Sequence, residues 1–195
     1  MQGKKGLVMG VANDRSIAWG IAKKLSENGA ELAFTYFGDA LKKRVSPLAE
    51  SINSKTLMDC NVENKDDVKK TFKEIQKKWG KIDFVVHAIA FSDRGELSGQ
   101  YINTSRENFL KSMLISCFSF TEVAKEASKI MNEGSSMITL TYESSKVIPN
   151  WKDIFCFLIC NPFQKLFLPF CKSLLILFYH HPNNESIIHL FPRLP

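Results

Sequence analysis

A short apolar run, a glycine turn and an amphipathic helix constrain this chain most. The apolar run 6–10 ends at Gly10, and apolar residues at helical spacing begin at Ile17. A strand, a glycine turn and a helix start bring unpaired backbone N–H groups and the positive end of the helix dipole to one point. Such a point favours a pyrophosphate group. The gap from Gly10 to Gly20 is wider than in the common G-x-G-x-x-G pattern and contains Ser16.

The first 150 residues alternate between predicted strands and predicted helices. Strands are predicted at 6–11, 31–37, 56–62, 84–91 and 136–142, and helices at 16–28, 39–52, 64–79 and 105–132. This alternation predicts an α/β fold, a Rossmann-like doubly wound parallel sheet with helices on both faces and right-handed crossovers. Ligands of such sheets bind beyond the carboxyl ends of the strands. The residues at those predicted ends are Gly10, Phe37, Asn61, Val62, Ile89 and Tyr142.

The order of these motifs resembles the NADH-dependent enoyl-[acyl-carrier-protein] reductases of the short-chain dehydrogenase superfamily. Besides the long loop with Ser16 and Ile17, the matching segments are 31–36, 41–45, 86–92, 136–142 and 147–150. The resemblance covers residues 3–150, so we expect one dinucleotide-binding domain at 1–150. It implies NADH-dependent reduction of the double bond of an enoyl thioester on acyl carrier protein, in fatty-acid elongation. Family members are homotetramers, but much of that interface comes from a part of the chain that is not matched here.

The resemblance also implies a set of contacts to the cofactor. The residues in those places are Gly10, Ser16, Ile17, Phe37, Asn61, Val62 and Ile89. Asn61 stands where the family has an aspartate that binds the adenine edge, and asparagine keeps one acceptor and adds a donor. Phe37 replaces a residue that is often polar, and we expect it to stack on adenine. Ile89 is expected beside the nicotinamide, although ordinary core packing explains it equally well, and Ser92 is expected to line the acyl pocket.

The end of the second predicted strand bears on the choice between NADH and NADPH. It reads Tyr36-Phe37-Gly38, with no acidic residue to bind the ribose hydroxyls. Three basic residues follow at Lys42, Lys43 and Arg44, which leaves a contact to a 2′-phosphate as an alternative. In the NADH-using family members these residues are plain helix surface. NADH is therefore the predicted cofactor.

The catalytic positions depart from the family. There, a tyrosine hydroxyl bonds the developing enolate oxygen, and a lysine seven residues later holds the nicotinamide ribose. These positions are Trp151 and Leu158 here. An indole N–H only donates and leucine forms no hydrogen bond, so neither replaces its counterpart. Tyr142 matches the second active-site tyrosine of the family, which lines the substrate; its alternative is an ordinary aromatic at a strand end. The chain is thus predicted to be either a working reductase or an inactive remnant that at most binds nucleotide.

The composition changes abruptly after Asn150. Residues 151–195 hold seven of the 15 phenylalanines and five of the seven prolines, and no regular period fits them. We expect an apolar, aromatic-rich tail that is not folded as in the family, produced by a frame change or an aberrant end of the reading frame. A membrane-inserting hairpin is the alternative, which the prolines and lysines within the apolar run disfavour. The predicted sheet is then incomplete on its C-terminal side, with its fifth strand as an exposed edge.

Charge and cysteine content exclude several other classes of function. The net charge of +6 is spread along helices that alternate lysines with acids, which is not the clustered pattern of a nucleic-acid-binding protein. The five cysteines are irregularly spaced, and Cys60 and Cys117 lie among apolar residues. With no export signal before the first strand, they predict reduced thiols in the cytoplasm. The cysteines and histidines of the tail fit no ligand spacing, so no metal is predicted.

Overall fold

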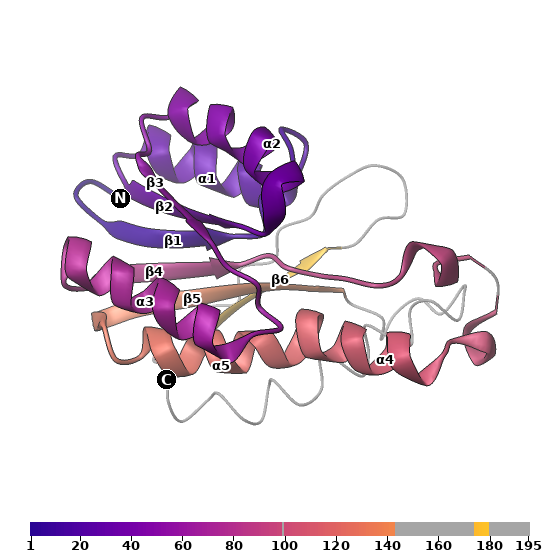
Figure 1. Cartoon of the computed structure of the whole chain (residues 1–195). Helices are drawn as coiled ribbons and strands as arrows, with labels where there is room; N and C mark the ends of the chain where they lie inside the picture. Colours follow the sequence, from indigo (N-terminus) through magenta and orange to yellow (C-terminus); the bar gives the residue numbers. More distant parts are fainter. Residues whose placement is uncertain (99, 143–173, 180–195) are drawn as a thin grey trace.

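The computed structural model describes residues 1–98, 100–142 and 174–179 (Figure 1). The strands are β1 (Lys5–Met9), β2 (Glu31–Tyr36), β3 (Thr56–Asp59), β4 (Ile82–His87), β5 (Met131–Tyr142) and β6 (Leu174–Tyr179). The α-helices are α1 (Ile17–Glu27), α2 (Gly38–Ser51), α3 (Lys65–Trp79), α4 (Arg106–Met113) and α5 (Ser119–Ala127). Two short 3₁₀ helices, η1 (Arg94–Glu96) and η2 (Tyr101–Asn103), follow β4, and a π-helical turn, η3 (Leu114–Phe118), joins α4 to α5.

The strands form one parallel sheet in the order β3-β2-β1-β4-β5-β6. This is the strand order of a doubly wound dinucleotide-binding sheet, with the change of direction between β1 and β4. In Figure 1, α1 and α2 cover one face of the sheet, and α3, α4 and α5 lie on the other. The predicted fold class is confirmed.

Alternating residues of the strands supply the two apolar cores. Leu7 and Met9 of β1 point into the core beneath α3 and α5, whereas Val8 between them packs with Trp19 of α1 and Val45 of α2. All three β1 residues are fully buried. A parallel strand covered on both faces reads as a continuous apolar run, since both of its faces are buried. This explains why β1 was recognisable from its sequence.

The predicted helix 105–132 is interrupted and shorter in the structure. The turn η3 separates α4 from α5, and the helical segment ends at Ala127. Two serine hydroxyls accompany the interruption: Ser119 donates to the Ile115 carbonyl at 2.6 Å, and Ser116 exchanges hydrogen bonds with the backbone of Phe91. Hydroxyls that bond to backbone carbonyls one turn earlier bend helices. This local effect accounts for the break within an otherwise regular apolar pattern.

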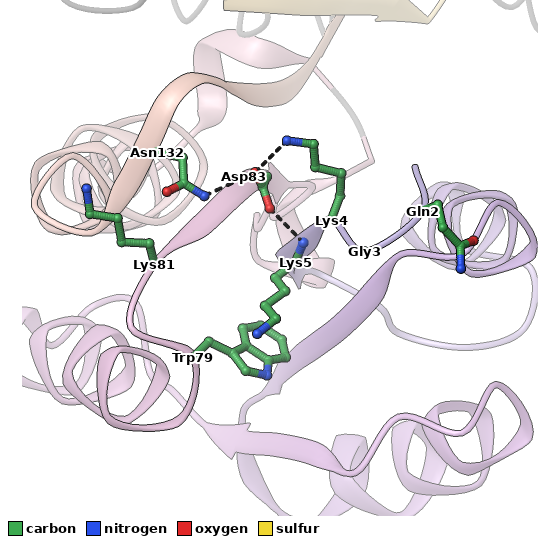
Figure 2. A pocket seen from close by; sticks show the side chains of 8 residues that line it. All are labelled: Gln2, Gly3, Lys4, Lys5, Trp79, Lys81, Asp83 and Asn132. Atoms are coloured by element: carbon green, nitrogen blue, oxygen red, sulfur yellow. Dashed lines mark hydrogen bonds and ion pairs between the residues drawn. The ribbon is translucent and has the colours of Figure 1, made fainter.

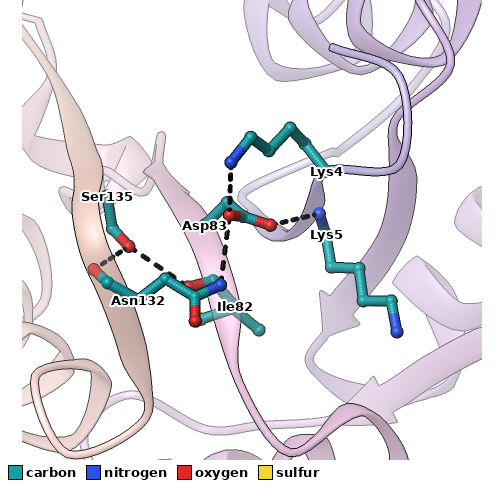
Figure 3. Close-up of polar contacts among 6 residues, drawn as sticks. All are labelled: Lys4, Lys5, Ile82, Asp83, Asn132 and Ser135. Atoms are coloured by element: carbon teal, nitrogen blue, oxygen red, sulfur yellow. Dashed lines mark hydrogen bonds and ion pairs between the residues drawn. The ribbon is translucent and has the colours of Figure 1, made fainter.

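Strand β5 begins five residues before its predicted start, at a bulge beside Asp83 (Figure 3). Met131 pairs with Ile82 and Ser136 pairs with Phe84, so four residues of β5 lie opposite Asp83 alone. Asn132 donates to Asp83 at 3.1 Å, and Lys4 and the backbone N–H of Lys5 bond to the same carboxylate at 2.8 and 2.9 Å. Partial burial opposes ionisation, but these hydrogen bonds outweigh it and lower the pKa of Asp83. The carboxylate thereby joins β1, β4 and β5 at the amino end of the sheet.

The sixth strand corrects one expectation about the tail. Leu174–Tyr179 pairs in parallel with β5, from Met137 opposite Leu174 to Tyr142 opposite Tyr179, so β5 is not an exposed edge. The segment reads Leu-Leu-Ile-Leu-Phe-Tyr, a short continuous apolar run that is typical of a parallel strand. The other tail residues, and therefore the predicted boundary at residue 150, lie outside the described residues. Among the described helices, none is long and apolar enough to cross a membrane.

Candidate functional site

The carboxyl ends of β1 to β4 bring together most of the residues that the sequence singled out. The loop after β4 meets the end of β1, because the amide of Ala88 donates to the carbonyl of Met9 at 3.0 Å. The loop after β3 meets the end of β2 in the same way, through a 2.8 Å bond from Cys60 to Tyr36. Gly10, Phe37, Asn61 and Ile89 therefore follow neighbouring strand ends at one edge of the sheet. This edge is where ligands of doubly wound sheets bind.

Gly10 turns the chain away from β1 with a φ of 97°. A Cβ atom at this position would collide with the backbone carbonyl of Ala88. Glycine is therefore required twice, once by the positive φ and once by the approach of the loop after β4. Gly10 was predicted as a contact to the cofactor; the contact with Ala88 is a second reason for glycine, and it lies within the fold itself.

The loop before α1 leaves the first amides of that helix without acceptors. The hydroxyl of Ser16 donates to the carbonyl of Asn13 at 2.7 Å, and it makes no capping bond to the helix. Within the part of the chain that the structure describes, no acceptor bonds the amides of Ile17 and Ala18. No acidic residue lies in the first turn of α1. Two donors thus stand at the positive end of a helix dipole, an arrangement that binds anions.

The end of β2 carries an exposed aromatic ring. Phe37 precedes α2 and is 55% exposed, so its ring is accessible beside the carboxyl end of β2. Phe37 has no side-chain acceptor to cap α2. The carboxylate of Asp59, at the end of β3, accepts a long 3.4 Å hydrogen bond from Gly38, the first residue of α2. Asp59 was not predicted as a site residue, because only the pairing of β2 with β3, in which Asp59 lies opposite Tyr36, brings it to this place.

The loop after β3 positions Asn61 and Val62. The side-chain oxygen of Asn61 accepts from the amide of Glu63 at 3.0 Å, a local turn that these side chains favour. The side-chain oxygen, which was predicted to accept from the adenine edge, is therefore already bonded within the loop. Within the described ranges, the amide nitrogen of the Asn61 side chain bonds to no acceptor, so it is the group left for a ligand. Val62 is buried at 6% exposure and belongs to the apolar core.

The loop after β4 is held by a buried asparagine on α4. Asn108, 7% exposed, accepts from the amide of Asp93 at 2.8 Å and donates to the hydroxyl of Ser92 at 3.2 Å and to Glu96 at 3.1 Å. Ser92, the predicted acyl-pocket residue, therefore faces α4. Sequence reasoning missed Asn108, although an asparagine inside a helix, where it is a poor helix former, is the signal that marks it. Ile89 is half-buried and packs against the core on the α3 and α5 face.

His87 ends β4 beneath this loop and is fully buried. Its Nε2 lies 2.9 Å from the hydroxyl of Ser119, which itself donates to Ile115, so the imidazole donates from Nε2. Among the described residues, no group bonds to Nδ1. Burial lowers the pKa of His87 to about 4, because a charged imidazole would lose its hydration. The ring is a neutral structural group at neutral pH.

Of the residues predicted at the catalytic positions, the structure describes only the backbone of Tyr142. Tyr142 is the last residue of β5, at the same carboxyl edge as the other predicted site residues, and it pairs with Tyr179. The side chain of Tyr142, and all of Trp151 and Leu158, lie outside the described residues. Their roles stay predictions.

A separate cavity of about 450 Å³ lies at the opposite, amino end of the sheet (Figure 2). Its lining residues are Gln2, Gly3, Lys4, Lys5, Trp79, Lys81, Asp83 and Asn132. Three lysines give it a basic character, but Asp83 pairs with Lys4, and the indole N–H of Trp79 donates to Glu31 at 2.9 Å. Its polar groups join strand ends to one another. None of the predicted site residues lines it.

Comparison with known proteins gives consistent matches over most of the chain. A sequence model of the family described as enoyl-(acyl carrier protein) reductase matches residues 10–155. Enoyl-[acyl-carrier-protein] reductase [NADH] 2 of Rhizobium meliloti (strain 1021) is 59% identical over 152 residues, which are 77% of this chain and 57% of that protein. Enoyl-[acyl-carrier-protein] reductase [NADH] FabI of Rickettsia bellii (strain RML369-C) is 48% identical, over 77% of this chain and 58% of its own length.

Solved structures agree with these sequence matches. An enoyl-(acyl-carrier-protein) reductase from Anaplasma phagocytophilum, in complex with NAD, superposes with a TM-score of 0.80 at 46% identity, over 87% of this chain and 66% of that one. FabI from Candidatus Liberibacter asiaticus gives a TM-score of 0.84 at 44% identity, over 91% and 71% of the two chains. The chain spans less than three-fifths of the length of the two curated relatives named above.

Proposed function

Because this chain belongs to the enoyl-(acyl carrier protein) reductase family, we propose that it binds NADH for the reduction of enoyl thioesters carried on acyl carrier protein. The observation that carries this proposal is the pair of unsatisfied amides, Ile17 and Ala18, at the start of α1 and beside the Gly10 turn. Two NADH-named relatives and a family structure in complex with NAD support the choice of cofactor.

The donors at the start of α1 fit the pyrophosphate of a dinucleotide. The amides of Ile17 and Ala18 donate to its oxygens, and the hydroxyl of Ser16 lies at the same helix start. A helix N-terminus stabilises a negative group by about 0.3–1 kcal/mol at an exposed site. We assign the phosphates to this point, with the loop from Gly10 to Ser16 passing around them.

The remaining contacts of the cofactor follow the strand ends. The exposed ring of Phe37 stacks on adenine, which covers an apolar surface that is otherwise in water. The side-chain nitrogen of Asn61 donates to the adenine edge, with Val62 packed beneath it, and Ile89 lies beside the nicotinamide. NADH, when bound, supplies the hydride that reduces the double bond. Ser92 and Tyr142 border the acyl chain.

A second candidate function is nucleotide binding without turnover. The observation that favours it is the pair Trp151 and Leu158, which stand where the family resemblance places a tyrosine hydroxyl and a lysine. An indole N–H donates but has no proton to give up as a hydroxyl has, and leucine forms no hydrogen bond to a ribose, so the pair does not reproduce the two groups. The cofactor site of residues 10–92 is the same in both candidates. They differ only in the reduction step.

Two measurements on the full chain separate these possibilities. Calorimetry with NADH measures binding, and the loss of NADH absorbance with a short enoyl thioester measures turnover. Turnover close to that of an intact relative supports the reductase; binding without turnover supports the second candidate. A folded chain that binds no NADH contradicts both.

A further inference from the structure

The end of β2 lacks the acid that usually selects NADH. In doubly wound sheets, an aspartate or glutamate near this point binds the ribose hydroxyls and leaves no room for a 2′-phosphate, whereas a nearby basic residue accommodates it. Here β2 is followed by Phe37 and Gly38. Lys42 on α2 lies close by, with its Nζ 5.9 Å from the centre of the Tyr36 ring. Taken alone, these residues favour NADPH.

The neighbouring strand supplies a carboxylate at the same place. Asp59 is the last residue of β3 and lies opposite Tyr36, the last residue of β2, in the parallel register. Its side chain is exposed, and one oxygen accepts the 3.4 Å bond from the amide of Gly38. Asp59 therefore stands at the start of α2, although it is 21 residues away from Gly38 in the sequence.

At this position, the carboxylate of Asp59 disfavours binding of the 2′-phosphate that distinguishes NADPH from NADH. The first amide of α2 and the positive end of its dipole would otherwise attract an anion. Asp59 bonds that amide and adds a negative charge beside it. A second acid, Asp39, lies in the first turn of α2. Ribose hydroxyls can donate to the remaining lone pairs of the Asp59 carboxylate, while a 2′-phosphate is repelled by it.

We propose that Asp59 is the residue that makes this site prefer NADH over NADPH, with its carboxylate replacing the missing acid of β2 and opposing the charge of Lys42. The inference rests on the proposed function, because it assumes that the adenosine of a dinucleotide lies over the ends of β2 and β3. It adds a selectivity residue that comes from a different strand.

The test compares the dissociation constants of NADH and NADPH for the full chain by calorimetry. The unaltered chain is expected to bind NADH at least about tenfold more tightly, since two phosphate charges each interact with the carboxylate at a surface site. Asp59→Asn keeps an acceptor for Gly38 and removes only the charge. It is expected to reduce the NADH preference about tenfold, mostly by tighter NADPH binding, and less so in 1 M salt, where screening is strong.

The control is Glu50→Gln, which removes the same charge at the opposite end of α2 and should leave both constants unchanged. Lys42→Gln should weaken NADPH binding and leave NADH binding unchanged. An unaltered chain that binds both dinucleotides equally overturns the inference without any variant. So does an Asp59→Asn chain that binds NADH and keeps the full preference, and in both cases the proposed function stands. A folded chain that binds neither dinucleotide overturns the proposed function itself.

Discussion

The buried imidazole of His87 makes the stability of this protein depend on pH in a defined window. In the unfolded chain the ring takes up a proton below its ordinary pKa of 6.5, but in the folded protein burial lowers that pKa to about 4. Between these two values the unfolded state therefore binds more protons than the folded state. Stability contributed by the neutral ring is complete above pH 6.5 and is lost as the pH falls toward 4.

The size of this effect follows from the shift of the pKa. A decrease from 6.5 to about 4, at 1.36 kcal/mol per unit, corresponds to a loss of about 3 kcal/mol in the free energy of unfolding. Urea unfolding curves of the full chain at pH values from 7.5 to 4 measure it. The aspartates and glutamates also titrate near the acid end of this range, so the curve of the wild-type chain alone does not isolate His87.

A variant that cannot titrate isolates the contribution of the imidazole. His87→Gln keeps a side-chain donor for Ser119 and carries no charge at any pH. We expect it to be less stable than the wild type at pH 7.5 and to lose less stability on acidification, so that the two curves converge by about 3 kcal/mol near pH 4. Curves that stay parallel over the whole range would refute the reasoning, because the folded-state pKa would then equal the unfolded one.

Three further predictions concern the turn, the strand junction and catalysis. Gly10→Ala should lower the free energy of unfolding by about 2 kcal/mol or more, because of the positive φ and the collision with Ala88. Gly80→Ala, at a similar φ in open space, should lower it by only about 1 kcal/mol. Thermal unfolding of the two variants measures the difference. Asp83→Asn should lower the free energy of urea unfolding at pH 7 by about 1 kcal/mol, since the charged bonds to Lys4 and the Lys5 amide are weakened; an unchanged midpoint would contradict this. The second candidate function, nucleotide binding without turnover, predicts that turnover of a short enoyl thioester falls at least about a hundredfold below that of an intact relative. A rate near the relative's supports the reductase and would show that other groups replace the lost hydroxyl.

Regular local patterns made most of the fold predictable. Strand β1 is buried on both faces and contains the apolar run Leu7-Val8-Met9. Strand β4 contains another, 84–86, between two polar residues. Short apolar runs of this kind indicate buried parallel strands. Helix α3 shows Val68, Phe72 and Ile75 at helical spacing, and its capping residue Asn64 accepts from Asp66. These signals depend on near neighbours in the chain. The alternation of strands and helices predicted the parallel sheet with helices on both faces.

Features that depend on distant residues could not be predicted. The early start of β5 requires Asn132 to meet Asp83, which lies 49 positions away. The capping of α2 by Asp59 requires the register between β2 and β3. The apolar run of β6 resembles a parallel strand, but it lies in a stretch without a regular period, and its pairing with β5 joins segments that are distant in the sequence.

The candidate site shows the same division. The glycine turn and the start of α1 were recognisable because strand, turn and helix are adjacent in the sequence. By contrast, the carbonyl of Ala88 that excludes a side chain at Gly10 comes from the loop after β4, far away in the sequence. The side-chain oxygen of Asn61 accepts from the amide of Glu63, which is a local bond. The sequence analysis did not consider this bond, because it compared Asn61 only with the aspartate of the family.

The most direct test of the central claim is an amide NMR titration of the full chain with NADH, which shows at which end of the sheet the nucleotide binds. The account predicts that the resonances of Ile17 and Ala18 shift in a saturable way, because their amides gain an acceptor. The resonances of Lys5 and Asn132, at the cavity on the amino end, should stay in place. Shifts confined to that cavity, or no shifts at all in a folded chain, would contradict the account.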